Sequence, residues 1–353
     1  MRSHDAASVL ALSKGFGERV ERMRREVARV IVGQDRVVDE LLMTLLAGGH
    51  ALIEGVPGLA KTLLVNTLSQ ALSLDSGRVQ FTPDLMPSDI VGSQVIVQHV
   101  VGGDSARSFR FQKGPVFVNM LLADEINRTP PKTQAALLEA MAERRVSLGG
   151  QQHVLPQPFF VLATQNPIEQ EGTYNLPEAQ LDRFLTKITI DYPTFEEERA
   201  IVKRTTANDP EEEVTPCVSR EEILTLQELV RQLPASRHVI EYATRLVRRS
   251  RPTYDDAPAW VREQMAWGAG PRAAQSLIMA AKARTLIQGR FAVTRADVRD
   301  VALPVLRHRL LTSFPAEAKG LTVDDLVCQL LLDTPSFPEV DGYDAATQAI
   351  LRL

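Results

Sequence analysis

The sequence predicts an α/β domain built on a parallel β-sheet, followed by a helical domain. Short apolar runs, separated by helical or loop segments, occur at residues 51–53, 79–81, 120–123, 159–163 and 186–190. A parallel sheet covered on both faces produces this alternation. Strand patterns fade after Tyr192-Pro193, and helical spacing dominates from residue 220. The predicted domains therefore span residues 1–192 and 193–353.

The composition is that of an ordinary globular protein. The chain has 353 residues, of which 44% are hydrophobic and 24% charged, with a net charge of −4. The negative charge argues against nucleic acid as the main partner. No apolar run is long enough to cross a membrane, and Cys217 and Cys328 lie outside any metal-ligand spacing. We therefore expect a cytoplasmic protein with reduced thiols.

Two amphipathic helices are predicted before the first strand. Apolar residues recur at helical spacing in residues 16–30. After a break at Ile31-Val32-Gly33-Gln34, a second helix is expected to run to about Leu46. The first apolar strand, Ala51-Leu52-Ile53, then leads into a loop rich in glycine.

That loop, Gly55-Val56-Pro57-Gly58-Leu59-Ala60-Lys61-Thr62, is the most informative stretch of the chain. Its glycines and proline favour a tight turn between strand and helix, in which backbone N–H groups point at phosphate oxygens. Lys61 would add a positive charge for the β and γ phosphates, and Thr62 would offer a hydroxyl to Mg²⁺. The helix that follows directs its positive end at the same anion. The pattern predicts a site for a nucleoside triphosphate.

Ala60 stands where such loops usually have glycine. We expect a methyl group there to be tolerated only if the backbone is helical, with negative φ. An ordinary Gly/Pro turn is the alternative interpretation of residues 55–62. The acid pair described next argues against that alternative.

Asp124 and Glu125 follow the apolar run Leu121-Leu122-Ala123. Asp124 is expected to supply a second metal contact, and Glu125 to be the base that positions water. Asn166 follows another apolar run, at the edge of the sheet where ligands bind in α/β folds. Its alternative role is to cap a turn before Pro167.

Two stretches depart from the strand–helix alternation and predict β-hairpins. The first, at about 91–111, is centred on Gly102-Gly103, and the second, at about 146–158, on Gly149-Gly150. Both would be insertions that protrude from the sheet domain.

The second domain carries helix-start patterns. Thr194 with Glu197 predicts a capping box and a helix from residue 195, and two further starts are expected at Thr294 and Thr322. Arg272 follows Pro271 in the first turn of a predicted helix. A cation there opposes the helix dipole, which favours contact with an anion over a purely structural role.

Several long segments are specific enough to indicate a family. They are Ile31 to Gln34, Gly55 to Thr62, Gln80 to Asp89, Phe109 to Val118, Asp124 to Arg128, Ala163 to Pro167, Pro177 to Phe184 and Gly270 to Arg272. Together they resemble the MoxR-type AAA+ ATPases of the helix-2-insert clade, from about Val30 to about Leu332. Members of this family commonly carry alanine at the position of Ala60.

The resemblance implies an AAA+ P-loop NTPase αβα domain followed by an all-helical lid. The two predicted hairpins would be the helix-2 insert and the pre-sensor hairpin. The family also implies a homo-oligomeric ring, usually a hexamer, that binds ATP and Mg²⁺ between subunits. Its members resemble chaperones that remodel or mature other proteins, often with a partner bearing a von Willebrand factor A domain.

The resemblance also implies residue roles. Asn166 would be sensor 1, Arg272 would be sensor 2, and Arg183 would be the arginine finger that enters a neighbour's site. Arg128 is the rival for that contact, and a surface salt bridge is the alternative role of Arg183. The implied nucleotide contacts are Val32, Gly33, Gln34, Gly55 to Leu63, Asp124 and Arg272, with adenine near the first three.

The expected function is therefore ATP hydrolysis by a ring-forming chaperone. A nucleic-acid motor or a chelatase-like ATPase subunit would share the same architecture. The first hairpin offers only Arg107 and Arg110 with Phe109 and Phe111 for nucleic acid, which is weak support. A nucleotide-gated scaffold with little turnover is a third possibility.

Overall fold

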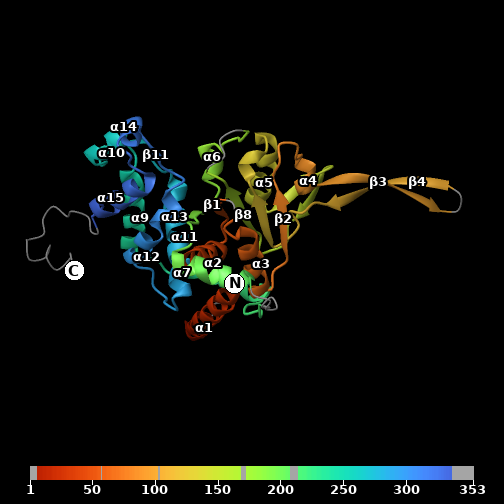
Figure 1. The fold of residues 1–353 in the computed structure, drawn as a ribbon, viewed down its shortest axis with the longest axis horizontal. Helices are drawn as coiled ribbons and strands as arrows, with labels where there is room; N and C mark the ends of the chain where they lie inside the picture. Colours follow the sequence, from red (N-terminus) through yellow and green to blue (C-terminus); the bar gives the residue numbers. More distant parts are fainter. Residues whose placement is uncertain (1–5, 57, 102–103, 168–171, 207–213, 336–353) are drawn as a thin grey trace, which may run out of the picture. The chain divides into compact units, whose positions relative to one another are not determined.

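The computed structural model describes residues 6–56, 58–101, 104–167, 172–206 and 214–335. Its contacts divide the chain into two compact units, which we call the sheet unit and the helical unit (Figure 1). The sheet unit comprises Arg19–Phe184 and Ile188–Leu226. The described part of the helical unit comprises residues 6–18, 185–187 and 227–335. The boundary that we place near Tyr192 stays a prediction.

The sheet unit is built on a five-stranded sheet in the order β2-β5-β8-β1-β9. The strands are β1 (Ala51–Glu54), β2 (Ser76–Gln80), β5 (Met120–Asp124), β8 (Phe160–Gln165) and β9 (Thr186–Thr189). β2, β5, β8 and β1 pair in parallel. The predicted α/β fold class is confirmed, and each apolar run coincides with a strand.

The central strands are buried on both faces. Leu121, Leu122 and Ala123 are successive and all buried, and successive strand residues point to opposite faces. The helices of this unit are α2 (Asp35–Leu46), α3 (Lys61–Ala71), α4 (Pro87–Val91), η1 (Ile126–Arg128), α5 (Pro131–Glu143), α6 (Glu178–Leu181) and α7 (Phe195–Thr206). α3 packs against β2 and β5, and Leu137 of α5 joins the core cluster that contains Leu121. Helical packing on the sheet therefore fixes the positions of the strand ends.

Two antiparallel hairpins extend from the sheet unit. They are β3 (Gly92–Val101) with β4 (Asp104–Lys113), and β6 (Arg145–Leu148) with β7 (Gln151–Val154). Figure 1 shows the first as a long ribbon that projects away from the sheet. At its base Gly92 has φ +99°, and a Cβ there would lie 2.3 Å from the carbonyl oxygen of Gln112, so only glycine fits. Phe111 stacks on His153 with 4.0 Å between ring centroids, which joins the two hairpins. Gly102 and Gly103 lie outside the described residues.

The helical unit contains α9 (Arg237–Arg249), α10 (Ala259–Gln264), α11 (Pro271–Ile287), α12 (Arg295–Asp300), α13 (Ala302–Leu306), α14 (Phe314–Ala318) and α15 (Val323–Asp333). α1 (Ala6–Val30) and α8 (Arg220–Gln232) each cross a limit between the units. The capping boxes expected at Thr294 and Thr322 are present. This unit also holds a short ribbon of β10 (Met265–Trp267) and β11 (Leu311–Thr312), so it is not entirely helical. Strands of two or three residues are too short to show a periodic pattern.

Within the described residues, no helix has both the length and the apolar composition that crossing a bilayer requires. Both cysteines are free thiols. Thr194 and Glu197 form the expected pair at the start of α7, because the Glu197 carboxylate accepts from the Thr194 N–H at 2.7 Å.

His50 is buried at the start of β1 and ties this strand to its neighbours. The Val161 N–H donates to its Nδ1 at 3.0 Å, so Nε2 carries the proton and faces the Met141 carbonyl oxygen at 3.3 Å. The ring also meets Phe159 edge-on. Burial lowers the pKa of His50 from 6.5 to about 4, so the neutral form is the folded form.

The lowered pKa predicts an acid-sensitive core. As the pH falls, the unfolded chain takes up the His50 proton before the folded chain does. The stabilisation is therefore complete above pH 6.5 and is lost as the pH falls from 6.5 to about 4. At pH 5 the loss should be about 2 kcal/mol in the free energy of unfolding. His50→Gln, measured by urea unfolding at pH 7 and pH 5, should lose less between the two values; an equal loss in both proteins would contradict the assignment.

Candidate functional site

The glycine-rich loop joins β1 to α3, as expected. The helix begins at Lys61, whose Nζ donates to the Gly55 carbonyl oxygen at 2.5 Å. Burial lowers the pKa of Lys61, while the carboxylates of Asp124, Glu125 and Glu54 act in the opposite direction. The loop lysine and the acid pair therefore share one electrostatic environment. Pro57 lies outside the described residues.

The expectation for Ala60 was wrong. Its φ is +53° and its ψ is 27°, a left-handed conformation, and it forms the N-cap of α3. A left-handed conformation costs a residue with a Cβ about 1–2 kcal/mol. Ala60 therefore carries this cost in a backbone conformation that glycine adopts without strain.

Thr164 holds the two acids together. It is fully buried in β8, beside the end of β5. Its hydroxyl donates to Asp124 Oδ1 at 2.7 Å and accepts from the Glu125 N–H at 2.8 Å. Glu125 itself has φ +58°, so its backbone is held in a left-handed turn. The sequence does indicate Thr164, as a polar residue ending a buried apolar run, but we assigned it no role.

Two side chains of β2 also contact the acid pair, and sequence reasoning missed both. Arg78 Nη2 donates to Asp124 Oδ2 at 2.7 Å and to Gln80 Oε1 at 2.6 Å. The Gln80 amide in turn donates to Glu125 Oε2 at 2.8 Å. Arg128 Nε lies 3.1 Å from the same oxygen of Glu125. Both carboxylates are thus bound by polar groups of their own chain.

The donor set suits a hard cation. Asp124 offers carboxylate oxygens, and Thr62 opens α3 with a hydroxyl. Magnesium prefers oxygen ligands and takes one or two from protein, the rest coming from phosphates and water. In the part of the chain that the structure describes, no group of three or more histidine, cysteine and acidic residues could hold a metal. A metal bound here would take its other ligands from phosphates and from water.

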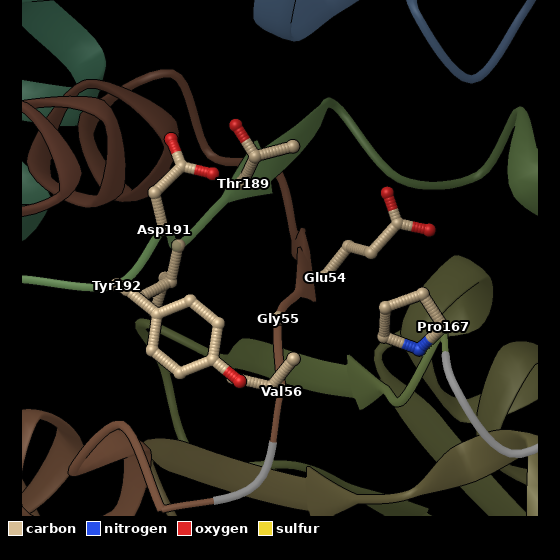
Figure 2. Close-up of a pocket in the computed structure, with 8 residues that line it drawn as sticks. Glu54, Gly55, Val56, Pro167, Thr189, Asp191 and Tyr192 are labelled. Carbon is tan, nitrogen blue, oxygen red and sulfur yellow. The ribbon is translucent and has the colours of Figure 1, made fainter.

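A cavity of about 540 Å³ opens beside the start of the loop. It is lined by Glu54, Gly55, Val56, Pro167, Thr189, Ile190, Asp191 and Tyr192. Figure 2 shows Asp191 and Tyr192 on one side of it and Glu54 and Pro167 on the other. Its volume lies in the range of small-molecule sites. We interpreted Tyr192 only as a boundary residue, although the carboxyl end of an apolar strand is where such cavities form.

Comparisons with known proteins agree with this geometry. Residues 50–186 match the family model described as ATPase family associated with various cellular activities (AAA), and residues 258–329 match the AAA lid domain. The chain is 44% identical to Chaperone MoxR1 of Mycobacterium tuberculosis, over 92% of this chain and 83% of that protein. The chain belongs to the MoxR-type AAA+ ATPases. The predicted resemblance is therefore confirmed.

Two further comparisons support the same family. Protein MoxR of Methylorubrum extorquens is 31% identical, over 85% of this chain and 90% of that protein. A crystal structure of a candidate ATPase from Cytophaga hutchinsonii has a TM-score of 0.83 and 38% identity, over 92% of this chain and 97% of that one. The chain is a nucleotide-binding ATPase with an AAA+ α/β domain and a lid.

The residues expected to meet adenine in this MoxR-type chain form a tight turn. Gly33 has φ +69°, and a Cβ there would lie 2.2 Å from Glu197 Oε1. Gln34 has φ +63°, and its Oε1 is buried with no hydrogen-bond partner among the described residues. Arg36, two residues on, donates to the Thr189 carbonyl oxygen at 3.2 Å, which brings this turn to the cavity-lining strand β9.

The remaining predicted residues lie in different surroundings. Asn166 is buried directly after β8. Arg183 donates to the Leu138 carbonyl oxygen at 2.6 Å and lines a second cavity, of about 340 Å³, which shares no residue with the first. Arg272 is exposed in the first turn of α11, in the helical unit. The structure thus joins Lys61 to the acid pair and leaves the roles of these three residues as predictions.

The two hydrogen bonds of Thr164 predict that loss of its hydroxyl lowers both the ATPase rate and the free energy of unfolding. Thr164→Val keeps the shape but leaves the Glu125 N–H and Asp124 Oδ1 without this hydroxyl. The steady-state ATPase rate should fall by about 10- to 100-fold, as for other groups that orient a metal ligand. The free energy of unfolding should fall by about 1–3 kcal/mol. Thr164→Ser keeps the hydroxyl and should stay close to wild type; full turnover by Thr164→Val would contradict the positioning role.

Proposed function

We propose that this MoxR-type ATPase is a ring-forming, cytoplasmic chaperone that uses ATP hydrolysis to remodel or mature other proteins. The meeting of Lys61 with the acid pair Asp124-Glu125 at one sheet edge carries the hydrolysis part of the proposal. The name of its 44%-identical relative, a chaperone, supports the remodelling part. A hexamer, and a partner with a von Willebrand factor A domain, are proposed from the family resemblance.

In the proposed reaction, residues Gly55 to Leu63 bind the phosphates through backbone N–H groups and the Lys61 ammonium. Thr62 and Asp124 would hold magnesium, which neutralises charge on the phosphates when bound. Glu125 orients the attacking water and accepts its proton. Thr164 supports Glu125 by accepting its backbone N–H at 2.8 Å. Asn166 is proposed to hold the same water, and Arg272 to contact the γ-phosphate.

Adenosine is proposed to lie against the turn Val32-Gly33-Gln34. The buried, unpaired Oε1 of Gln34 supports this placement, because the exocyclic amino group of adenine is a donor. Guanine presents a carbonyl at the corresponding position, which would leave two acceptors facing each other. The site should therefore prefer ATP to GTP.

Arg183 is proposed as the residue that acts on a neighbouring subunit's nucleotide. Its rival, Arg128, contacts Glu125 of its own chain at 3.1 Å and so already serves the local acid pair. Arg183 instead lines a separate cavity on α5, with its guanidinium on a backbone carbonyl. These surroundings support Arg183 over Arg128 for the contact between subunits.

The assignment of the base predicts that binding and hydrolysis can be separated. Glu125→Gln keeps the shape of the side chain without its basicity, so fluorescent ATP should still bind while phosphate release falls about 10²- to 10⁴-fold. Lys61→Ala should abolish binding, because the loop loses its cation. Glu228→Gln, an exposed substitution on α8, is the matched control and should change neither. Native turnover by Glu125→Gln would refute the assignment.

The assignment of the arginine finger predicts complementation between two inactive proteins. Arg183→Ala should bind ATP but turn over about 10³- to 10⁵-fold more slowly. In mixed rings, its intact nucleotide site can meet the intact Arg183 of a Lys61→Ala neighbour, so some activity should return.

The same mixture made with Arg128→Ala tests the rival residue. Recovery with Arg183→Ala and none with Arg128→Ala would identify the finger. An inactive Arg183→Ala mixture, with mixed rings verified by native mass measurement, would overturn the assignment. If the chain forms no ring at the concentration of the assay, the proposed ring is wrong.

A further inference from the structure

Arg78 binds the carboxylate to which we assign the metal. Its guanidinium lies on Asp124 Oδ2, with Nη2 at 2.7 Å and Nε at 3.3 Å. The other oxygen, Oδ1, accepts from the Thr164 hydroxyl at 2.7 Å. Both oxygens of Asp124 are therefore occupied, one by a cation and one by a neutral group.

These two partners differ in what a metal would do to them. A carboxylate oxygen has two lone pairs, so Oδ1 can keep the neutral hydroxyl and still face a cation. A guanidinium and a divalent ion at the same carboxylate repel each other, so each weakens the binding of the other. Magnesium and Arg78 therefore oppose each other at Asp124.

Arg78 is placed so that it can leave. Half of its side chain is exposed (50%), compared with 16% for Asp124. An ion pair of this exposure is worth up to about fivefold in an equilibrium, so water can take the guanidinium at small cost. The Gln80 side chain, which also accepts from Nη2, orients the guanidinium toward Asp124.

We propose that Arg78 competes with magnesium for Asp124 and so sets the metal concentration at which this site binds nucleotide. The inference rests on the proposed function, which places the metal at Asp124. Arg78 acts through Asp124 and is a positioning residue. At low magnesium its guanidinium neutralises Asp124; at high magnesium the metal does so.

The test is the magnesium dependence of nucleotide binding by the full chain. A fluorescent, non-hydrolysable ATP analogue is titrated with magnesium, and the midpoint magnesium concentration is compared between variants. Arg78→Gln should lower the midpoint about three- to fivefold, because the competing charge is gone. Arg78→Lys keeps the charge but not the planar guanidinium, so it should lower the midpoint less than Arg78→Gln does.

Arg145→Gln is the matched control. Arg145 also joins a carboxylate, Glu143 at 3.0 Å, to a glutamine, Gln152 at 3.0 Å, but on the β6–β7 hairpin. It carries the same change of charge and should leave the midpoint unchanged. Thermal unfolding of each variant verifies that it is folded.

The outcomes separate the inference from the function on which it rests. An unchanged or raised midpoint in folded Arg78→Gln overturns the competition, as does a midpoint in Arg78→Lys that matches Arg78→Gln. A shift of equal size in Arg145→Gln also overturns it, because overall charge would then be the cause. If magnesium does not affect binding by the wild type, or if Asp124→Asn responds to magnesium as the wild type does, the metal assignment itself fails.

Discussion

The parallel pairing of β5, β8 and β1 is the constraint on which the site depends. Parallel strands end at the same edge of the sheet, so residues far apart in sequence meet there. The registers pair Ala123 with Ala163 and Glu54 with Gln165. This pairing brings the acid pair, Asn166 and the glycine-rich loop to one edge of the sheet. A slip of one residue in β8 would turn Thr164 to the opposite face and separate it from Asp124.

The two adjacent negative charges of the acid pair, beside a partly buried lysine, are each stabilised by hydrogen-bond donors. Thr164 and Gln80 contribute neutral donors, whereas Arg78 and Arg128 contribute charge. A neutral donor orients a carboxylate without competing with a metal ion for it, whereas a positively charged donor does compete. Each carboxylate has one partner of each kind, but those of Asp124 lie on different oxygens, whereas those of Glu125 share one oxygen. Loss of a neutral donor and loss of a charged donor should therefore have opposite effects on the affinity for metal.

Much of the fold could be predicted because its determinants are local. Apolar runs mark every strand of the main sheet, and the capping boxes at Thr294 and Thr322 depend on residues three positions apart. The contacts of Arg78 could not be predicted, because they require β2 to lie beside β5, and strand order is a property of the whole sheet. The cavity at Tyr192 was missed for the same reason. β9 is the last of the five strands in sequence, yet it lies beside β1, which is the first.

Strained backbone conformations occur at the proposed site, and the sequence did not predict them. The described residues with positive φ and a Cβ are Gln34, Ala60, Ser73, Glu125 and Arg144. Three of these five belong to the proposed nucleotide site. Such conformations cost about 1–3 kcal/mol each and persist only where the surrounding structure fixes them. At Glu125 the fixing contact is visible, because Thr164 accepts its backbone N–H. The same hydroxyl that orients Asp124 thus also stabilises the strained turn at Glu125, so one buried threonine supports both the proposed metal ligand and the proposed base.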